Sequence, residues 1–351
     1  AGLALASGQA ASNFAILNLC RAGDNFVCST GIYGGTWNLF ANTLKDLGIE
    51  CRFVDPSDPE NFRKATDAKT RCYYGETLAN PQLNVFPIRE VADIGRELGV
   101  PLIMDNTAAP MICRPLEHGA AVVIYSTTKY IGGHGTSIGG MVVDGGNFDW
   151  EAGGDRFPTL NQPDPSYHGA VWTEAVKPLG PIAYILRIRV ILLRDMGSAM
   201  SPMNAFQFIQ GLETLALRMP VHCENANKVA AFLKAHDKVS SVIHPSQQSG
   251  EPRRRADAYL DGGFGGLVGF ELKGGKDAGR RFIDGLELLY HVANIGDARS
   301  LAIHPASTTH SQLSAEDQVA AGVTPGYVRL SVGIEHIDDI LADLTQALDK
   351  A

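Results

Sequence analysis

The sequence between residues 25 and 145 alternates short β-rich runs with helical stretches, and this alternation restricts the fold more than any other feature. The runs expected to form strands are NFVCST, CRFVD, RCYYGET, PLIMDNT, AVVIYST and GGMVVDG. Helices are expected before CRFVD and over PIREVADIGRELG. The second of these has one apolar face, formed by Ile88, Val91, Ala92, Gly95 and Leu98. The pattern predicts an α/β fold with a mostly parallel sheet covered by helices on both faces.

The chain after residue 147 is organised differently. Residues 147–182 are rich in glycine, proline and aromatic residues, so we expect a long excursion from the sheet. Residues 204–236 are expected to form a helix that leads to a second unit. Strand-like GLVGFELKG and YVRLSVG, helix-like DAGRRFIDGLELL and a terminal helix predict a smaller α+β domain. We therefore divide the chain into an α/β domain over residues 1–235 and an α+β domain over residues 236–351.

The composition narrows the classes of partner. The net charge is −8 and no long block of lysine and arginine occurs, which disfavours a nucleic-acid surface. The six cysteines lack C-x-x-C spacing and the ten histidines lack metal-ligand spacing, so neither a disulfide framework nor a metal site is predicted. The apolar opening segment has no basic start, and its polar residues break any membrane span, so it is expected to begin a helix of the fold. We expect a cytoplasmic protein with a small-molecule ligand or a protein partner.

Two strand-like runs end on side chains suited to chemistry. Asp105 ends PLIMD, and Ser126, Thr128 and Lys129 come directly after AVVIY. Open α/β sheets bind ligands at the carboxyl ends of their strands, so these groups are expected at a ligand site. Taken singly, Lys129 also reads as a solvated loop residue and Asp105 as a turn cap.

Together, these residues are the parts that pyridoxal phosphate needs. A lysine forms an imine with this cofactor, and an aspartate keeps the ring nitrogen protonated so that the ring accepts electrons. A helix N-terminus receives the phosphate through its N–H groups and its dipole. The segment ASGQAA offers such a terminus at Ser7, Gly8 and Gln9, although it also reads as an ordinary helix start. The joint occurrence of all three parts in one α/β chain favours a pyridoxal-phosphate site.

Eight short motifs follow one another along the chain: SGQAA, YGGT, ETLANP, DNT, YSTTKYIGGHG, GLETLALRM, HPASTTHSQL and VRLSVGIEHIDDI. Through them the sequence resembles the pyridoxal-phosphate enzymes of cysteine and methionine metabolism over nearly the whole chain. The last two motifs are more similar to the O-acetylhomoserine sulfhydrylase (aminocarboxypropyltransferase) branch than to the related lyases. The resemblance implies an aminotransferase-like fold of type I, with a mostly parallel sheet of the seven-stranded type and a smaller C-terminal α+β domain.

The resemblance also implies which residues hold the cofactor, pyridoxal 5′-phosphate. Lys129 is similar to the lysine that forms the covalent imine and then moves protons between substrate carbons. Asp105 is similar to the aspartate that pairs with the ring nitrogen, and Asn80 to the residue near the ring hydroxyl. Phosphate contacts are implied for four residues, two through hydroxyls and two through backbone amides: Ser126, Thr128, Gly8 and Gln9.

Three further residues match positions that meet the substrate. Tyr33 resembles the tyrosine that stacks on the ring and acts as an acid or base at the leaving group; without the resemblance it reads as a packed aromatic in a glycine turn. Arg329 resembles the arginine that takes the α-carboxylate in a two-pronged salt bridge. Ser300 resembles the serine whose backbone region orients the lysine and the carboxylate.

The implied reaction is γ-replacement, in which O-acetyl-L-homoserine and sulfide give L-homocysteine and acetate in methionine biosynthesis. Residues 147–182 are interpreted as a lid over the acyl end, and Arg156 and Arg218 as the arginines able to bind a second carboxylate, such as that of a succinyl ester. A γ-lyase, a cystathionine γ-synthase or an O-succinylhomoserine sulfhydrylase would use the same residues. An inactive subunit with a role in assembly or regulation is the alternative from another class.

The resemblance implies a homotetramer, a dimer of dimers with shared sites, acting on an amino acid and on sulfide or a thiol. Members of the family carry an N-terminal arm with a tyrosine and an arginine that reach the cofactor phosphate of a neighbouring subunit. The sequence begins after that position and without methionine, so we expect the natural chain to begin upstream. The alternative is a protein that binds the cofactor without the arm.

Overall fold

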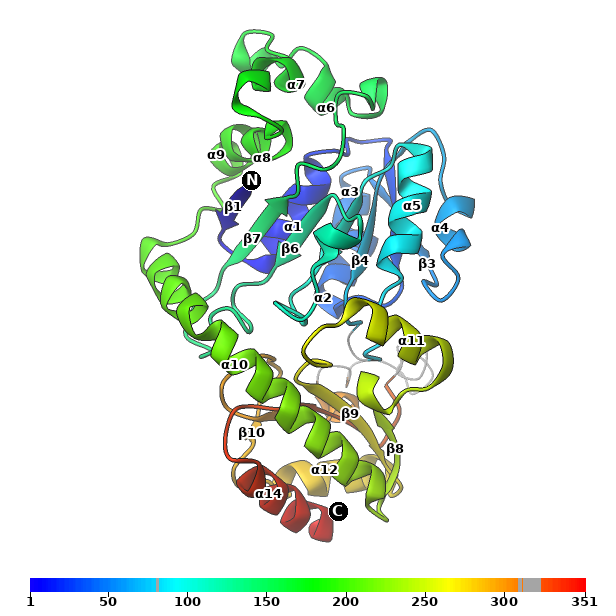
Figure 1. Ribbon diagram of the computed structural model, residues 1–351, viewed down its shortest axis with the longest axis vertical. Coiled ribbons are helices and arrows are strands. Elements are labelled where there is room, and N and C mark those ends of the chain that lie inside the picture. Colours follow the sequence, from blue (N-terminus) through cyan, green and yellow to red (C-terminus); the bar gives the residue numbers. More distant parts are fainter. Residues whose placement is uncertain (80–81, 309–310, 312–322) are drawn as a thin grey trace.

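The computed structural model describes residues 1–79, 82–308, 311 and 323–351 (Figure 1). The strands of its larger sheet are β1 (Gly2–Leu5), β2 (Asn25–Ser29), β3 (Glu50–Val54), β4 (Thr70–Glu76), β5 (Leu102–Asp105), β6 (Val122–Tyr125) and β7 (Gly140–Asp144). From edge to edge their order is β1, β7, β6, β5, β4, β2 and β3. β7 runs antiparallel to both β1 and β6, whereas the other neighbours pair in parallel. The sheet confirms the predicted seven-stranded, mostly parallel α/β architecture.

Helices cover both faces of this sheet. Successive residues of a strand point to opposite faces, so Tyr74 joins the apolar core under α1 (Gly8–Leu17) and Tyr73 joins the core under α5 (Ile88–Leu98). The position of α5 confirms the prediction from its apolar face. The helix ends because Gly99 adopts a φ of 66°, a left-handed conformation that suits glycine.

The opening residues differ from the prediction of a helix start. β1 lies at the edge of the large sheet and pairs with β7, and α1 begins only at Gly8. Leu3 and Leu5 point into the core, while Gly2 on the same strand is exposed. An alternation over four residues is too short to separate from a helical pattern, and pairing with β7 decides it.

Residues 147–182 fold into short helices. These are Gly154–Arg156, α6 (Pro158–Asn161), Pro165–Tyr167, α7 (Trp172–Ala175) and Lys177–Leu179. Arg156 donates to the carbonyl of Thr70, the first residue of β4, at 2.6 Å, and Trp150 and Phe157 join the core around α1. The segment therefore packs at the amino ends of the strands. The interpretation of it as a lid is wrong for this chain, because the predicted site residues lie at the opposite ends.

A long helix, α10 (Pro202–Ala235), leads to a second sheet (Figure 1). The strands of that sheet are β8 (Val239–Ile243), β9 (Leu267–Leu272), β10 (Tyr290–His291), β11 (Leu301–Ile303) and β12 (Tyr327–Ser331). Their order is β10, β11, β12, β9 and β8. The last part of α10 packs with α12 (Gly275–Gly285) and α14 (Ile337–Lys350) in the core of this sheet. We propose that the two domains are residues 1–235 and 236–351, with the boundary at the end of α10.

The remaining described helices are short, apart from α11. They are α2 (Gly34–Asn38), α3 (Leu44–Asp46), α4 (Glu60–Lys64), α8 (Ala183–Arg187), α9 (Arg194–Met196) and α11 (Gly250–Tyr259), with π-helical turns at Leu39–Thr43 and Ile188–Leu193 and 3₁₀ turns at Pro115–His118, Pro245–Gln247 and Pro305–Ser307. None of the helices in the described part of the chain has the length and apolar character needed to cross a membrane. Among the same residues, no group of three or more His, Cys, Asp or Glu side chains is arranged to hold a metal ion.

Candidate active site

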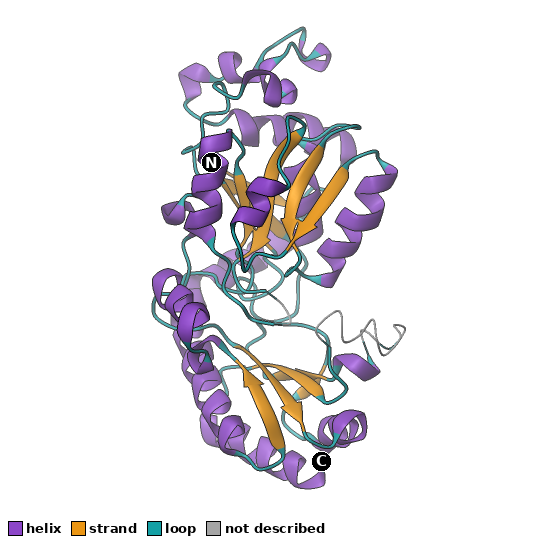
Figure 2. Cartoon of the chain, turned by 90° about the vertical axis from the view of Figure 1, so that its right-hand side faces the viewer, coloured by secondary structure: helices purple, strands orange, loops and turns teal. Residues whose placement is uncertain are grey.

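The carboxyl ends of β5 and β6 bring predicted cofactor residues together. Asp105 is the last residue of β5, and Ser126 comes directly after β6. Thr107 joins the two segments, because its hydroxyl accepts the Ser126 N–H at 2.7 Å. This edge of the large sheet faces the smaller sheet (Figure 2). The candidate site therefore lies between the two sheets, where an open α/β sheet is expected to bind its ligand.

The amino end of α1 lies against Ser126. Ser7 caps the helix by accepting the N–H of Ala10 at 3.0 Å. A Cβ atom at Gly8 would lie 2.6 Å from the Ser126 Cβ, so the approach requires glycine. The first N–H groups of a helix have no partner within it, and the helix dipole favours an anion there. The helix start and Ser126 thus form a cradle that fits a phosphate group.

The other two predicted phosphate contacts are also fixed in place. The Thr128 hydroxyl donates to the carbonyl of Gly139 at 3.3 Å and accepts its N–H at 3.1 Å. The side-chain oxygen of Gln9 accepts the Thr36 hydroxyl at 2.9 Å. The backbone N–H of Gln9 lies in the first turn of α1, and its contact with the phosphate stays a prediction.

Asp105 lies in a buried polar cluster. Its carboxylate accepts the Thr107 N–H at 2.9 Å and the Tyr74 hydroxyl at 3.5 Å. Burial raises the pKa of Asp105, and a cation such as a pyridinium N–H would favour its charged form again. Glu76 stands opposite Asp105 in the register of β4 and β5 and accepts the Tyr33 N–H at 2.6 Å. Burial, followed by the Asp105 charge, raises the pKa of Glu76 well above its usual range.

Lys129 and Arg329 meet at Asn294, although they come from different sheets. The Lys129 Nζ donates to the Asn294 Oδ1 at 2.5 Å, and the Arg329 Nη2 donates to the Asn294 carbonyl at 3.1 Å. Burial and, after it, the Arg329 charge lower the pKa of Lys129 to about 8. Burial also lowers the pKa of Arg329. The site thus pairs an amine of reduced basicity with a half-buried guanidinium suited to a carboxylate.

Three predicted site residues remain to be placed: Tyr33, Ser300 and Asn80. Tyr33 precedes α2 with 53% of its surface exposed, and its phenol is near enough to influence the pKa of Arg329. Ser300 is buried; its N–H and hydroxyl donate to Glu335 at 2.6 and 2.8 Å, so its side chain is committed to the fold. Asn80 lies outside the described residues.

Neither arginine considered for a second carboxylate reaches this site. Arg156 binds backbone carbonyls at the amino end of β4, as described above. Arg218, on α10, donates to the carbonyls of Tyr130, Ile131 and Gly211 at 2.7, 3.2 and 2.8 Å. Its guanidinium supports the chain that follows Lys129, and its place inside the protein is explained by these bonds.

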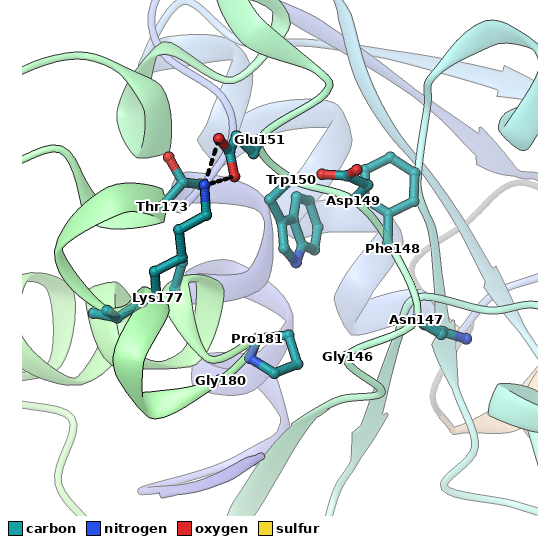
Figure 3. A pocket seen from close by; sticks show the side chains of 12 residues that line it. Gly146, Asn147, Phe148, Asp149, Trp150, Glu151, Thr173, Lys177, Gly180 and Pro181 are labelled. Atoms are coloured by element: carbon teal, nitrogen blue, oxygen red, sulfur yellow. Dashed lines mark hydrogen bonds and ion pairs between the residues drawn. The ribbon is translucent and has the colours of Figure 1, made fainter.

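A hollow of about 480 Å³ lies elsewhere (Figure 3). Its lining is formed by residues 146–151 together with Thr173, Val176, Lys177, Gly180, Pro181 and Ala183. Lys177 and Glu151 form an ion pair at its wall, at 2.8 Å. All of these residues except Gly146 and Ala183 belong to residues 147–182 at the amino ends of the strands, and none was singled out as a cofactor or substrate contact. We therefore do not assign the active site to this hollow.

Residues 1–349 match the family model described as Cys/Met metabolism PLP-dependent enzyme. The chain belongs to this family. The O-acetyl-L-homoserine sulfhydrylase of Leptospira meyeri is 53% identical over 99% of this chain and 80% of its own length. The homocysteine synthase of Schizosaccharomyces pombe is 45% identical over 100% of this chain and 82% of its own. A crystal structure of a putative O-acetylhomoserine (thiol)-lyase from Campylobacter jejuni matches with a TM-score of 0.93 and 40% identity, covering 99% of this chain and 82% of that one.

Membership in the Cys/Met PLP-dependent family confirms the predicted family, fold type and cofactor. The Campylobacter jejuni structure contains N′-pyridoxyl-lysine-5′-monophosphate, a lysine carrying the cofactor. In this chain the residues present fit that cofactor: an amine at Lys129, a half-buried carboxylate at Asp105, and the anion cradle between Gly8 and Ser126. When bound, pyridoxal phosphate supplies the electron sink that acidifies protons on the substrate carbons.

Sequence reasoning missed two residues of this family member's site. Glu76 lies within the motif ETLANP. Its position opposite Asp105 could have been predicted once both strands were identified. Asn294 lies in VANIGDARS, which has no strand or helix pattern of its own. Its contact with Lys129 spans 165 positions of sequence and depends on how the two sheets pack.

Proposed function

We propose that this chain is a PLP-dependent transferase that converts O-acetyl-L-homoserine and sulfide into L-homocysteine and acetate. The observation that carries the proposal is the meeting of Lys129 and Arg329 at one residue, because an amine for the cofactor then stands beside a cation for an amino acid carboxylate. The names of the relatives, sulfhydrylase and homocysteine synthase, support the acyl ester and the sulfur chemistry. The reaction balances without a further reactant, because hydrosulfide and the acetyl ester together supply all the atoms of homocysteine and acetate.

Each proposed residue has one task. Arg329 binds the α-carboxylate and so orients the Cα–H bond toward Lys129. Lys129 Nζ takes the proton from Cα, then one from Cβ, and returns them as the product forms. At a pKa of about 8, roughly a tenth of the amine is neutral at pH 7, far more than for an exposed lysine. Asp105 stays charged beside the ring nitrogen, and Tyr33 assists the departing acetate.

An acetyl donor fits this site better than a succinyl donor. A succinyl ester carries a second carboxylate, which needs its own cation. Arg156 and Arg218, the arginines considered for that task, are bound to backbone carbonyls away from the site. We therefore expect kcat/KM for O-acetyl-L-homoserine to exceed that for O-succinyl-L-homoserine at least about tenfold, or about 1.4 kcal/mol in the barrier.

The test compares both esters at fixed sulfide and measures homocysteine directly. The expected result is homocysteine from the acetyl ester and little consumption of that ester when sulfide is omitted. Rapid consumption without sulfide would identify a γ-lyase instead. Equal or better use of the succinyl ester would move the chain to another branch of the family. Arg156→Ala serves as a control, since a role in acyl binding would change the ratio between the esters and a structural role would not.

We also propose that the protein is a cytoplasmic homotetramer. Exposed apolar side chains line one side of the first two thirds of α10: Met203, Phe206, Ile209, Leu212, Leu217 and Val221. A face of this kind is typical of an interface, and a second copy of the chain is the proposed partner. All six cysteines are free thiols, which suits a reducing compartment. Light scattering on a size-exclusion column gives the assembly mass, and Leu217→Glu is expected to reduce it.

A further inference from the structure

The backbone of Tyr33 is held at the start of α2. Its N–H donates to the Glu76 Oε1 at 2.6 Å, and its carbonyl accepts the Trp37 N–H at 2.9 Å. A Cβ atom at Gly35 would lie 2.5 Å from the Tyr33 Cε1, so the ring lies over a glycine of the first helical turn. The ring itself is 53% exposed and is not locked by a packed core. The bond to Glu76 therefore ties Tyr33 to the large sheet.

Glu76 is fixed in turn at the carboxyl end of β4. It stands opposite Asp105 in the register of β4 and β5, and only 8% of its surface is exposed. The next residue, Thr77, donates its N–H to the Asp105 carbonyl at 2.9 Å, which holds the ends of the two strands together. Glu76 therefore places Tyr33 relative to Asp105, the residue proposed for the ring nitrogen.

The first turn of α2 has a second tether, on the side of the anion cradle. The Thr36 hydroxyl donates to the side-chain oxygen of Gln9 at 2.9 Å, and Gln9 belongs to the first turn of α1. The start of α2 is thus bound to the cradle through Thr36 and to the end of β4 through Glu76. Together these two bonds give the exposed Tyr33 ring a defined place.

Glu76 and Asp105 have different hydrogen-bond partners. Asp105 accepts the Thr107 N–H and the Tyr74 hydroxyl, whereas Glu76 accepts the Tyr33 N–H. Two neighbouring carboxyl groups away from water do not both ionise readily, because each charge disfavours the other. The titratable groups that face Glu76 are Asp105 from β5, Tyr74 from β4 and Cys28 from β2, and none of them is a cation. The proton of the pair therefore belongs on Glu76 and the charge on Asp105.

We propose that Glu76 is a positioning residue whose side chain accepts the Tyr33 N–H and thereby sets the place of Tyr33 at the site. Glu76 does this as a neutral acid, while Asp105 holds the charge. This inference rests on the proposed function, in which Tyr33 assists the departing acetate. The task needs an acceptor oxygen and no charge. Glutamine supplies such an oxygen in the same shape and alanine does not, so the two substitutions separate the hydrogen bond from the charge.

The first test measures hydrogen–deuterium exchange of the cofactor-free chain by mass spectrometry, with fragmentation that resolves the Tyr33 amide. In Glu76→Ala this amide loses its acceptor, and its exchange is expected to quicken at least about tenfold. In Glu76→Gln the exchange is expected to match that of the wild type. Glu50→Ala, at an exposed position of β3, controls for the substitution.

Equal exchange in the wild type and Glu76→Ala would overturn the proposal. Equal acceleration in the alanine and glutamine variants would also overturn it, because the charge and not the acceptor would then matter. Should Glu76→Ala not accumulate, Glu76→Asp takes its place with the same expected outcomes, since its shorter side chain withdraws the acceptor from Tyr33.

The second test uses the enzyme loaded with pyridoxal phosphate. The circular dichroism of the bound cofactor is expected to change in Glu76→Ala and to stay the same in Glu76→Gln. In the alanine variant kcat is expected to fall roughly tenfold while KM changes little, and glutamine is expected to restore kcat. The pH profile of kcat is expected to be the same in the wild type and Glu76→Gln.

Unchanged dichroism and kcat in Glu76→Ala would contradict the positioning role, and a shifted pH profile in Glu76→Gln would contradict the neutral acid. Wild-type turnover is measured beside the variants. If the wild type forms no homocysteine, the proposed function fails, and the exchange result still decides whether Glu76 holds Tyr33.

Discussion

Replacing Lys129 with methionine is expected to stabilise the cofactor-free protein while it abolishes turnover. The ammonium of Lys129 is mostly removed from water and lies near the Arg329 guanidinium. Methionine has a similar length, carries no charge and fills the same space. The trade between stability and function arises because a weakly basic catalytic lysine requires an environment that disfavours its charge.

The magnitude follows from the pKa of Lys129, which is lowered from 10.5 to about 8. Between these values the unfolded chain binds more protons than the folded chain, so stability rises with pH there. Below pH 8 the folded protein bears the full free-energy cost of holding the charged amine in this environment. The pKa difference of about 2.5 corresponds to a cost of roughly 3 kcal/mol. The lost hydrogen bond to Asn294 offsets about 1 kcal/mol of the gain. The net gain at pH 7 is therefore about 2 kcal/mol.

Urea unfolding of the cofactor-free chain at pH 7 and at pH 10 checks this. At pH 10 most of the cost has vanished, so the advantage of Lys129→Met should fall below about 1 kcal/mol. Lys45→Met, at an exposed position of α3, controls for the change of side chain. A methionine variant that is no more stable than wild type at pH 7, or a gain that persists unchanged at pH 10, would refute the argument.

Three further outcomes test the other parts of the site. Asp105→Ala should lower kcat by several orders of magnitude, because the buried carboxylate stabilises charge at the ring nitrogen; near-normal turnover would make Asp105 a turn cap. Gly8→Ala should weaken pyridoxal phosphate binding at least about tenfold in a fluorescence titration, since its methyl group would lie 2.6 Å from Ser126 Cβ; unchanged affinity would mean that the cradle adapts. Arg329→Lys keeps the charge and loses the two-pronged geometry, so KM for the amino acid should rise more than kcat falls, as initial rates over a range of substrate concentrations would show.

Residues of the candidate site could be predicted where the evidence for them lies in a short stretch of sequence. Asp105, Ser126 and Lys129 could be placed because each lies at the end of an apolar run, and parallel strands bring such ends to one edge of a sheet. Gly8 could be placed because a helix start is a local pattern. Ser300 illustrates the limit: the resemblance placed it at the substrate, and in the structure its N–H and hydroxyl both donate to Glu335.

The sequence by itself determined the order of the strands between residues 25 and 145 and the family, and it supplied the residues that are proposed to hold pyridoxal phosphate. Those properties follow from periodicity and from short motifs, which act over a few residues. Only the tertiary structure decided that residues 147–182 pack at the amino ends of the strands and that Asn294 joins Lys129 to Arg329. These contacts connect segments far apart in the chain. Their cause is the packing of one sheet and its helices against another, which no local pattern records.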